Sequence, residues 1–319
     1  MATTVYFASN RVLTGPPDDS RSYGPNIQPP SVPGGMMYGT AFVNGVDIGT
    51  DNAGQITQIE DVSQGGFSQQ AIDDLSDPGR NLLVFVHGFN NIFSEAITRA
   101  AFNREWLTAS GFSAVDTTVL TFSWPSLGKI ASFPILPADY LHDQNMARLS
   151  GIHLMTFFAN LEPILRAARA NNRKTLLIAH SMGNLALQSA VENWFLHGNG
   201  NALLFDRVIL AAGDCRDDTF NQPNLAGLSG ITRLARRVSV YYSHADQILQ
   251  LSTFVNGGAQ RLGQDGPRNR SDQSVFPGAQ YRMVDATGFR DYAFDPLSSH
   301  QYYRQSSLAR KEIAADMAA

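Results

Sequence analysis

Hydrophobic residues along the chain gather into short, uninterrupted runs that alternate with segments of helical spacing. Uninterrupted runs of this length are typical of strands buried on both faces of a sheet. From residue 81 onward they predict strands over 81–86, 117–124, 176–180, 207–214, 237–246 and 280–284. Apolar positions three and four apart predict helices over 94–110, 154–168, 184–196 and 301–317. Strands alternating with helices predict an α/β fold, with a mostly parallel sheet and helices on both faces.

The first 80 residues follow a different pattern. Residues 3–10 predict a first strand, and residues 15–35 form a long loop rich in proline and glycine. Residues 37–43 and 54–60 alternate between apolar and polar, as antiparallel edge strands do, and 67–75 suits a short helix. We therefore expect one domain over 1–319, in which residues 1–80 supply edge strands and the loop. Residues 81–319 then form the core, with small cap segments.

Composition narrows the classes of function. The chain has 319 residues, of which 43% are hydrophobic and 16% charged, and its net charge is −4. This balance is that of a soluble globule and gives no electrostatic case for a nucleic-acid or anionic-membrane partner. Cys215 is the single cysteine, so no intramolecular disulfide forms. The N-terminus lacks a signal-like or membrane-spanning run, so we expect a cytoplasmic protein, and its oligomeric state is left open.

The most informative stretch is 176–184, in which an apolar run ends on Ser181 and a helical pattern begins at once. A strand that turns sharply into a helix needs small residues two positions before and two after the tip, as Ala179 and Gly183 are. The tip residue is forced into a strained conformation that exposes its hydroxyl. The first helical N–H groups, beginning with Met182, then point toward the carbonyl oxygen of the group that the serine attacks. An ordinary buried serine at a strand-to-helix junction is the alternative.

This stretch resembles the nucleophile elbow of the alpha/beta-hydrolases, with Ala179 where glycine is commoner. The wider match covers residues 5–11, His87 to Asn90, 122–126 and the elbow. It resembles a bacterial alpha/beta-hydrolase family of unknown function. The resemblance implies the alpha/beta-hydrolase fold. It also implies that the loop opened by His87 and Gly88 supplies a second oxyanion N–H from Phe89.

A serine nucleophile needs a histidine base and an acid, which this superfamily carries in the order nucleophile, acid, histidine. His300 is the only histidine downstream of every candidate acid, and it lies between the last strand and the final helix. The resemblance favours Asp246, which ends the second strand after the elbow. Asp214, at the end of the adjacent strand, is the main alternative. Either carboxylate can instead cap a following helix. Further candidates for the acid are Asp217, Asp285 and Asp295.

Aromatic and aliphatic residues should gather near Ser181 as an apolar substrate wall without an evident cationic clamp. This wall favours uncharged, small to medium acyl groups in a fairly open cleft, because residues 215–236 leave room for only a small cap. We expect substrate contacts from Trp124, Phe133, Leu136 and Tyr140, together with Phe89, Ile135 and Met182.

The sequence therefore predicts a serine hydrolase acting on a small-molecule carboxylic ester. A thioesterase or amidase with the same residues, or a non-catalytic hydrolase-like binding protein, is the alternative. Metal-ligand spacings and phosphate-binding glycine loops do not occur, so we expect neither a metal nor a cofactor.

Overall fold

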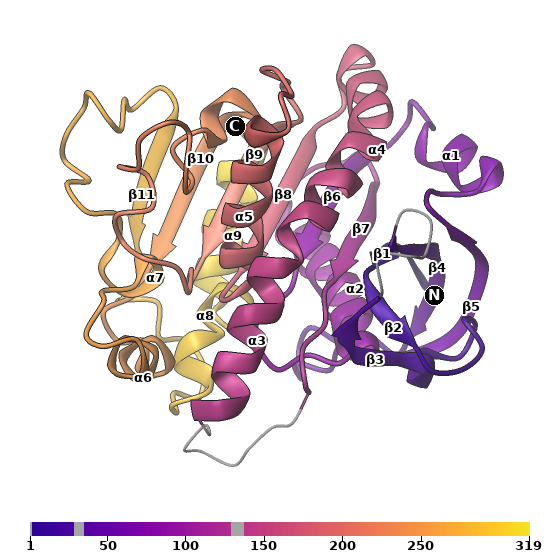
Figure 1. Cartoon of the computed structure of the whole chain (residues 1–319), viewed down its shortest axis with the longest axis horizontal. Coiled ribbons are helices and arrows are strands. Elements are labelled where there is room, and N and C mark those ends of the chain that lie inside the picture. Colours follow the sequence, from indigo (N-terminus) through magenta and orange to yellow (C-terminus); the bar gives the residue numbers. More distant parts are fainter. Residues whose placement is uncertain (1, 29–34, 129–136) are drawn as a thin grey trace.

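A computed structural model describes residues 2–28, 35–128 and 137–319. Its centre is a nine-stranded sheet with the order β11-β10-β9-β8-β6-β7-β1-β4-β5 (Figure 1). Neighbouring strands from β11 across to β1 are parallel, whereas β4 is antiparallel to both β1 and β5. The expectation of a mostly parallel sheet with an antiparallel N-terminal edge is confirmed.

The strand bounds follow the apolar runs closely. The sheet contains β1 (Thr3–Ser9), β4 (Met37–Asn44), β5 (Gln55–Gln64), β6 (Asn81–Val86), β7 (Thr117–Ser123), β8 (Thr175–His180), β9 (Phe205–Ala211), β10 (Ala235–Tyr242) and β11 (Tyr281–Asp285). A separate antiparallel pair is formed by β2 (Arg11–Leu13) and β3 (Tyr23–Ile27).

Strand β6 shows why the apolar runs are uninterrupted. Leu82, Val84 and Val86 belong to one hydrophobic core. Leu83 and Phe85 belong to a second core on the opposite face of the sheet. Because successive side chains point to opposite faces, a strand that lies between two helical layers must be apolar at every position.

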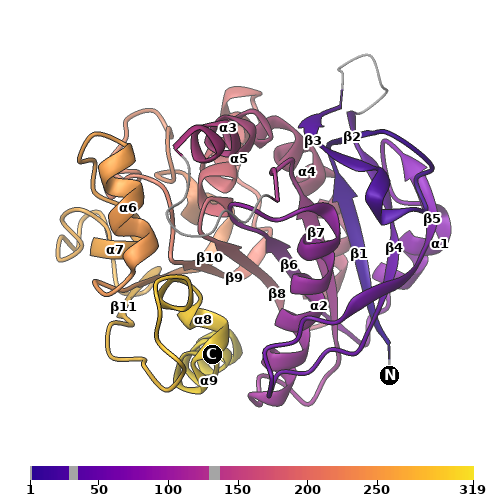
Figure 2. The ribbon, with the colours of Figure 1, turned by 90° about the horizontal axis from the view of Figure 1, so that it is seen from below.

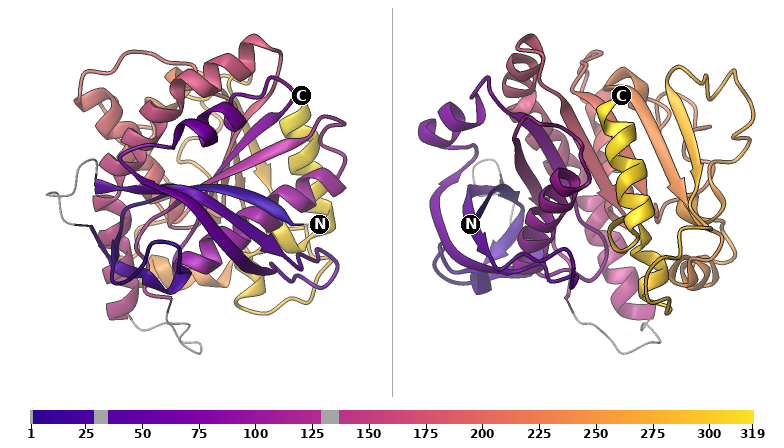
Figure 3. Two further views of the ribbon diagram at one scale, coloured as in Figure 1. Left: turned by 90° about the vertical axis from the view of Figure 1, so that its right-hand side faces the viewer. Right: turned by 180° about the vertical axis from the view of Figure 1, so that it is seen from behind.

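Helices cover both faces of the sheet. Helices α3, α4 and α5 pack on the first core, and α2 and α9 pack on the second, the face turned toward the viewer in the right panel of Figure 3. The helices are α1 (Gln69–Leu75), α2 (Phe93–Ala109), α3 (Pro137–Leu149), α4 (Gly151–Ala170), α5 (Gly183–Leu196), α6 (Gln247–Val255), α7 (Leu262–Asp265), α8 (Tyr302–Gln305) and α9 (Ser307–Ala318). Short 3-10 helices are η1 (Ser20–Ser22), η3 (Ile231–Arg233) and η4 (Ser298–His300). No helix within the described ranges is long and apolar enough to span a lipid bilayer.

Three features differ from expectation. Residues 15–35 contain β3, and helix α3 begins at Pro137, where no helix was expected, because proline is well tolerated in the first turn of a helix. The helix expected over 301–317 is divided at Ser306, whose backbone is extended and whose hydroxyl caps α9 by accepting from the Ala309 N–H.

Strands β6 to β10 all end at one edge of the sheet, as parallel strands must. Figure 2 views the molecule from this edge, where α3, α6 and α8 lie. Ligand sites of open α/β sheets occur outside the carboxyl ends of the strands, and this edge carries the candidate residues.

Candidate active site

The turn between β8 and α5 forms the expected elbow. Ser181 has a φ of 55°, the left-handed conformation that a non-glycine residue adopts only when its surroundings impose it. Gly183 leaves no room for a side chain, because a Cβ there would lie 2.5 Å from the carbonyl oxygens of Val86 and His87. A Cβ on Gly88 would lie 2.7 Å from the Cβ of Ser181. The elbow and the loop after β6 therefore pack against each other through glycines.

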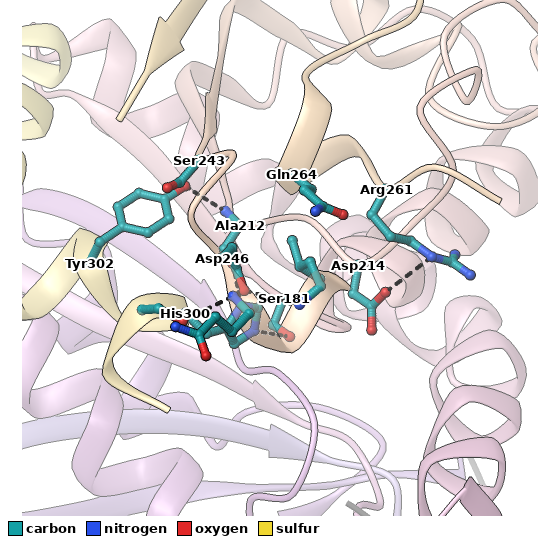
Figure 4. Close-up of polar contacts among 12 residues, drawn as sticks. Ser181, Ala212, Asp214, Ser243, Asp246, Arg261, Gln264, His300 and Tyr302 are labelled. Atoms are coloured by element: carbon teal, nitrogen blue, oxygen red, sulfur yellow. Dashed lines mark hydrogen bonds and ion pairs between the residues drawn. The ribbon is translucent and has the colours of Figure 1, made fainter. Parts of the chain in front are cut away.

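Three side chains from distant parts of the chain form one line of hydrogen bonds (Figure 4). Ser181 Oγ lies 2.7 Å from His300 Nε2. His300 Nδ1 lies 2.7 Å from Asp246 Oδ2. Ser181 follows β8, Asp246 follows β10, and His300 lies in η4. All three side chains are almost completely buried.

Asp246 controls the charge state of His300. Burial by itself would lower the pKa of His300, but the charge of Asp246 and its hydrogen bond outweigh burial and raise that pKa above its ordinary value. A carboxylate accepts hydrogen bonds only, so Nδ1 of His300 carries a hydrogen. In the neutral imidazole, Nε2 is then left as the acceptor that faces Ser181.

Asp214, the alternative acid, has other partners. Its carboxylate accepts from the Tyr140 hydroxyl at 2.8 Å and from Ser252 Oγ at 2.6 Å. The Arg261 Nε lies 3.7 Å away (Figure 4). The structure therefore places Asp246, and not Asp214, against the imidazole.

The proposed oxyanion donors are the N–H groups of Phe89 and Met182. Neither N–H donates a hydrogen bond to any of the described residues. Met182 directly follows Ser181 at the beginning of α5, and Phe89 follows Gly88, which packs against Ser181. Both amides are thus available to an oxygen atom bound beside the serine.

Residues 64–315 match the protein family described as alpha/beta hydrolase of unknown function (DUF900). The chain belongs to this family. The match begins at the end of β5 and runs into α9, so it includes the elbow, both carboxylates and His300. No curated protein is a significant match to the chain.

In this alpha/beta hydrolase a buried arginine fixes the loops around the site. Arg11 is 1% exposed, and its guanidinium donates to Ser123 Oγ at 2.9 Å, to the Ser126 carbonyl at 3.2 Å and to the Asn91 carbonyl at 2.7 Å. Burial lowers the pKa of Arg11 to about 9, against the charge of Asp143. Sequence reasoning did not find this role, because a single arginine after a strand usually lies at the surface.

Asp143 holds the loop that contains Phe89. Its carboxylate accepts from the N–H of Asn90 at 3.2 Å and from the N–H of Leu127 at 3.0 Å. Ser126 donates to the same carboxylate and accepts from the N–H of Asn91. The amides of the two residues that follow the proposed donor are thereby fixed.

Two residues beside His300 anchor it to the sheet. The Tyr302 hydroxyl donates to the Tyr241 carbonyl at 2.8 Å and accepts from the N–H of Ala212 at 3.2 Å (Figure 4). Ser299 Oγ accepts from the N–H of Gln247 at 3.0 Å. His300 is therefore held at the ends of β9 and β10.

A cavity of about 390 Å³ opens onto Ser181 and His300. Its apolar side is lined by Phe89, Tyr140, Ile248, Leu251, Val255 and Leu297. Its polar side includes Glu95, Arg99, Gln301, Arg304 and Gln305. The expected absence of a cationic group is thus wrong, because α2 and α8 bring two arginines to the cavity.

The other expected wall residues fare differently. Tyr140 lines the cavity. Trp124 does not: it is completely buried, its ring stacks on His87 at 4.9 Å, and its indole N–H donates to the His87 carbonyl at 2.8 Å. We correct its assignment as a substrate contact, since an aromatic residue at a strand end packs equally well on the neighbouring strand. Phe133, Ile135 and Leu136 lie outside the described residues.

Within the described ranges, no group of three or more His, Cys, Asp or Glu side chains is arranged to hold a metal ion.

Proposed function

We propose that the protein is a serine hydrolase that cleaves carboxylic esters through an acyl-enzyme. The observation that carries this proposal is the continuous line of hydrogen bonds from Asp246 through His300 to Ser181. In this arrangement the imidazole can remove the proton of a hydroxyl that is otherwise a poor nucleophile, and the carboxylate stabilises the imidazolium that forms.

The first half of the reaction transfers the acyl group. Ser181 Oγ bonds to the carbonyl carbon while its proton passes to His300 Nε2. The carbonyl oxygen becomes an oxyanion that accepts from the N–H groups of Phe89 and Met182. The bond to the alcohol oxygen then breaks, and His300 gives its proton to the leaving alcohol.

The second half restores the enzyme. His300 removes a proton from water, and the resulting hydroxide bonds to the acyl carbon. The bond to Ser181 Oγ breaks, and the serine recovers its proton from His300. The products are a carboxylic acid and an alcohol, and no other reactant is required.

The cavity supports a substrate of small to medium size. Its volume is about 390 Å³, and its apolar side is formed by α6 together with Phe89, Tyr140 and Leu297. Each buried methylene contributes about 0.8 kcal/mol, or roughly a fourfold gain in kcat/KM. The rate should therefore rise with acyl length until the cavity is full.

The test is hydrolysis of p-nitrophenyl esters of increasing acyl length, with matched thioesters and anilides. Wild type should cleave the esters, and Ser181→Ala should lose several orders of magnitude in kcat, on the order of 10⁶ by analogy with other triads. Ser229→Ala is the matched control, because that hydroxyl donates only to the nearby Ala226 carbonyl. A folded wild type that cleaves none of these compounds would favour a non-catalytic binding protein. Faster cleavage of thioesters or anilides would reassign the reaction class.

A further inference from the structure

Arg99 is a charged residue of the cavity that forms no hydrogen bond or ion pair with a carboxylate among the described residues. It lies on α2 and lines the same cavity as Ser181. Its Nη1 is buried and has no hydrogen-bond partner among the described residues. The charges of Asp51 and Glu95 act to raise the pKa of Arg99, but neither carboxylate accepts a hydrogen bond from it. A buried guanidinium nitrogen without a partner is unfavourable, so an anion that bound Nη1 would be favoured there.

A second guanidinium lies beside it and increases the excess of positive charge. Arg304 comes from α8 and lines the same cavity. The guanidinium carbons of Arg99 and Arg304 lie 5.8 Å and 5.9 Å from the centre of the Phe102 ring. Burial and the charge of Arg304 lower the pKa of Arg99 to about 10. Two cations beside one ring repel each other, and an anion bound between or beside them would offset this repulsion.

The two arginines differ in what they already bind. Arg304 forms an ion pair with Asp51, and its Nε donates to Gln301 Oε1 at 2.9 Å. Arg99 takes part in neither interaction. Of the two arginines, Arg99 is therefore the one with hydrogen-bonding capacity left for an anion bound in the cavity.

The carboxylates that line the cavity are occupied elsewhere. Glu95 accepts from the N–H of Ile92 at 2.7 Å and caps α2. Asp295 accepts from the N–H groups of Leu297 and Ser298. Asp214 is held by Tyr140 and Ser252 on the opposite side. None of these carboxylates bonds to Arg99, so its Nη1 remains open to an anion that enters the cavity.

We propose that Arg99, with Arg304 beside it, binds a carboxylate of the substrate, so that the preferred substrates are esters that also carry a carboxylate group. This inference rests on the proposed ester hydrolysis at Ser181. A carboxylate suits the site because its two oxygens match the planar guanidinium, and because its negative charge is attracted to both arginines. It replaces the expectation of an uncharged substrate, which assumed an apolar wall without arginine.

The experiment compares pairs of esters of matched size. One pair is the p-nitrophenyl monoester of glutaric acid and p-nitrophenyl pentanoate, which places the carboxylate on the acyl side. The other pair is the pentanoyl ester of glycolate and ethyl pentanoate, which places it on the alcohol side. In wild type, kcat/KM for the carboxylate ester should exceed that for its neutral partner in at least one pair. In Arg99→Met, the ratio should fall roughly ten- to hundredfold, the usual effect of losing a charged hydrogen bond.

Two further variants separate charge recognition from loss of folding. Arg99→Lys keeps the charge and should retain part of the ratio, because lysine lacks the bidentate fork. Arg166→Met removes an arginine whose side chain is 72% exposed on α4 and should leave the ratio as in wild type. Each variant is checked by thermal unfolding. A ratio that Arg99→Met leaves unchanged in both pairs, or a wild type that prefers the neutral ester in both, overturns the proposal.

Binding without turnover distinguishes failure of this inference from failure of the proposed function. In Ser181→Ala, calorimetry should show glutarate binding that is lost on adding Arg99→Met. Such binding supports the carboxylate site even if no ester is cleaved, in which case only the proposed reaction fails. Tighter binding of inorganic phosphate than of glutarate would overturn the assignment to a carboxylate.

Discussion

Asp246 serves two neighbours at once. Its Oδ2 lies against His300 Nδ1. Its Oδ1 accepts from the N–H of Leu249 at 3.0 Å, and this hydrogen bond caps α6. Binding the histidine and capping the helix were expected to be alternatives, but a carboxylate has enough lone pairs to do both. The cap fixes the rotamer of Asp246, and through it the orientation of the imidazole.

Exchange of the two carboxylates for amides should separate their roles. Asp246→Asn should lower kcat by about four orders of magnitude, because the amide favours the wrong tautomer of His300. Asp214→Asn should chiefly lower the free energy of unfolding, by about 1–3 kcal/mol, because its buried partners Tyr140 and Ser252 lose a charged acceptor. Steady-state kinetics and urea unfolding measure the two effects. The opposite pattern would make Asp214 the acid.

The pH dependence of hydrolysis should follow His300. The imidazole must be neutral to accept the serine proton, and its pKa is raised above 6.5. We therefore expect kcat/KM to fall about tenfold per pH unit on the acid side of a midpoint that lies above pH 6.5. In the residual activity of Asp246→Asn, the midpoint should move to lower pH, since the charge that raises the pKa is gone. A midpoint that does not move would show that another group titrates.

At the scale of residues, the sequence predicted what chain order and local spacing encode. The small neighbours of Ser181 and the position of His300 after every candidate acid predict two residues that the structure brings within 2.7 Å of each other. Arg99 was missed because nothing local distinguishes it from the other arginines, and its role appears only when α2 and α8 meet at Phe102. Arg11 was missed for the same reason, since its partners lie in loops far along the chain.

At the scale of elements, the junction between β8 and α5 depends on Gly183. In Gly183→Ala, the new Cβ would meet two carbonyl oxygens of β6 and the loop after it, and backbone atoms cannot move aside cheaply. We expect a loss of about 1–3 kcal/mol in the free energy of unfolding, together with lower kcat as the elbow shifts.

Gly200→Ala is the matched control for this substitution. A Cβ at Gly200 would meet nothing within 4 Å, so stability should change by no more than about 0.5 kcal/mol. Urea unfolding of both variants makes the comparison. Equal stability of Gly183→Ala and wild type would contradict the tight approach of the two backbones.

The long apolar runs made the central strands predictable, because only a strand between two helical layers is apolar throughout. Helix α6 was not expected, because its nine residues are few for a clear helical period and because it carries Phe254, which is 82% exposed. The division between α8 and α9 was also missed. It depends on Ser306 donating to Asp291 and capping α9, and Asp291 lies in a loop that the sequence alone does not place.

At the scale of the whole molecule, buried histidines should make the fold sensitive to acid. Burial, reinforced by the charge of Arg11, lowers the pKa of His87 to about 3. Burial and His300 hold the pKa of His180 well below its usual value. Both are neutral in the fold below pH 6.5, where the unfolded chain takes up a proton at each, so acid favours unfolding. His300 has the opposite shift, and its stabilising contribution is complete below pH 6.5 and is lost only at higher pH.

The free energy of unfolding should therefore fall by about 2–3 kcal/mol between pH 6 and pH 5. Urea unfolding at constant ionic strength measures this slope. His180→Gln should reduce it, because the glutamine amide does not titrate. His197→Gln should not, because His197 is exposed. A stability that is flat over this range would show that the buried histidines are accessible to protons in the fold.

The central claim is that Ser181 is a nucleophile activated by His300. The most direct measurement is covalent labelling with a fluorophosphonate probe, read by intact mass and by mapping the modified peptide. We predict one adduct on wild type, located at Ser181, no adduct on Ser181→Ala, and labelling slowed by orders of magnitude in His300→Ala. A folded wild type that stays unlabelled, or that carries the adduct on a different residue, would contradict it.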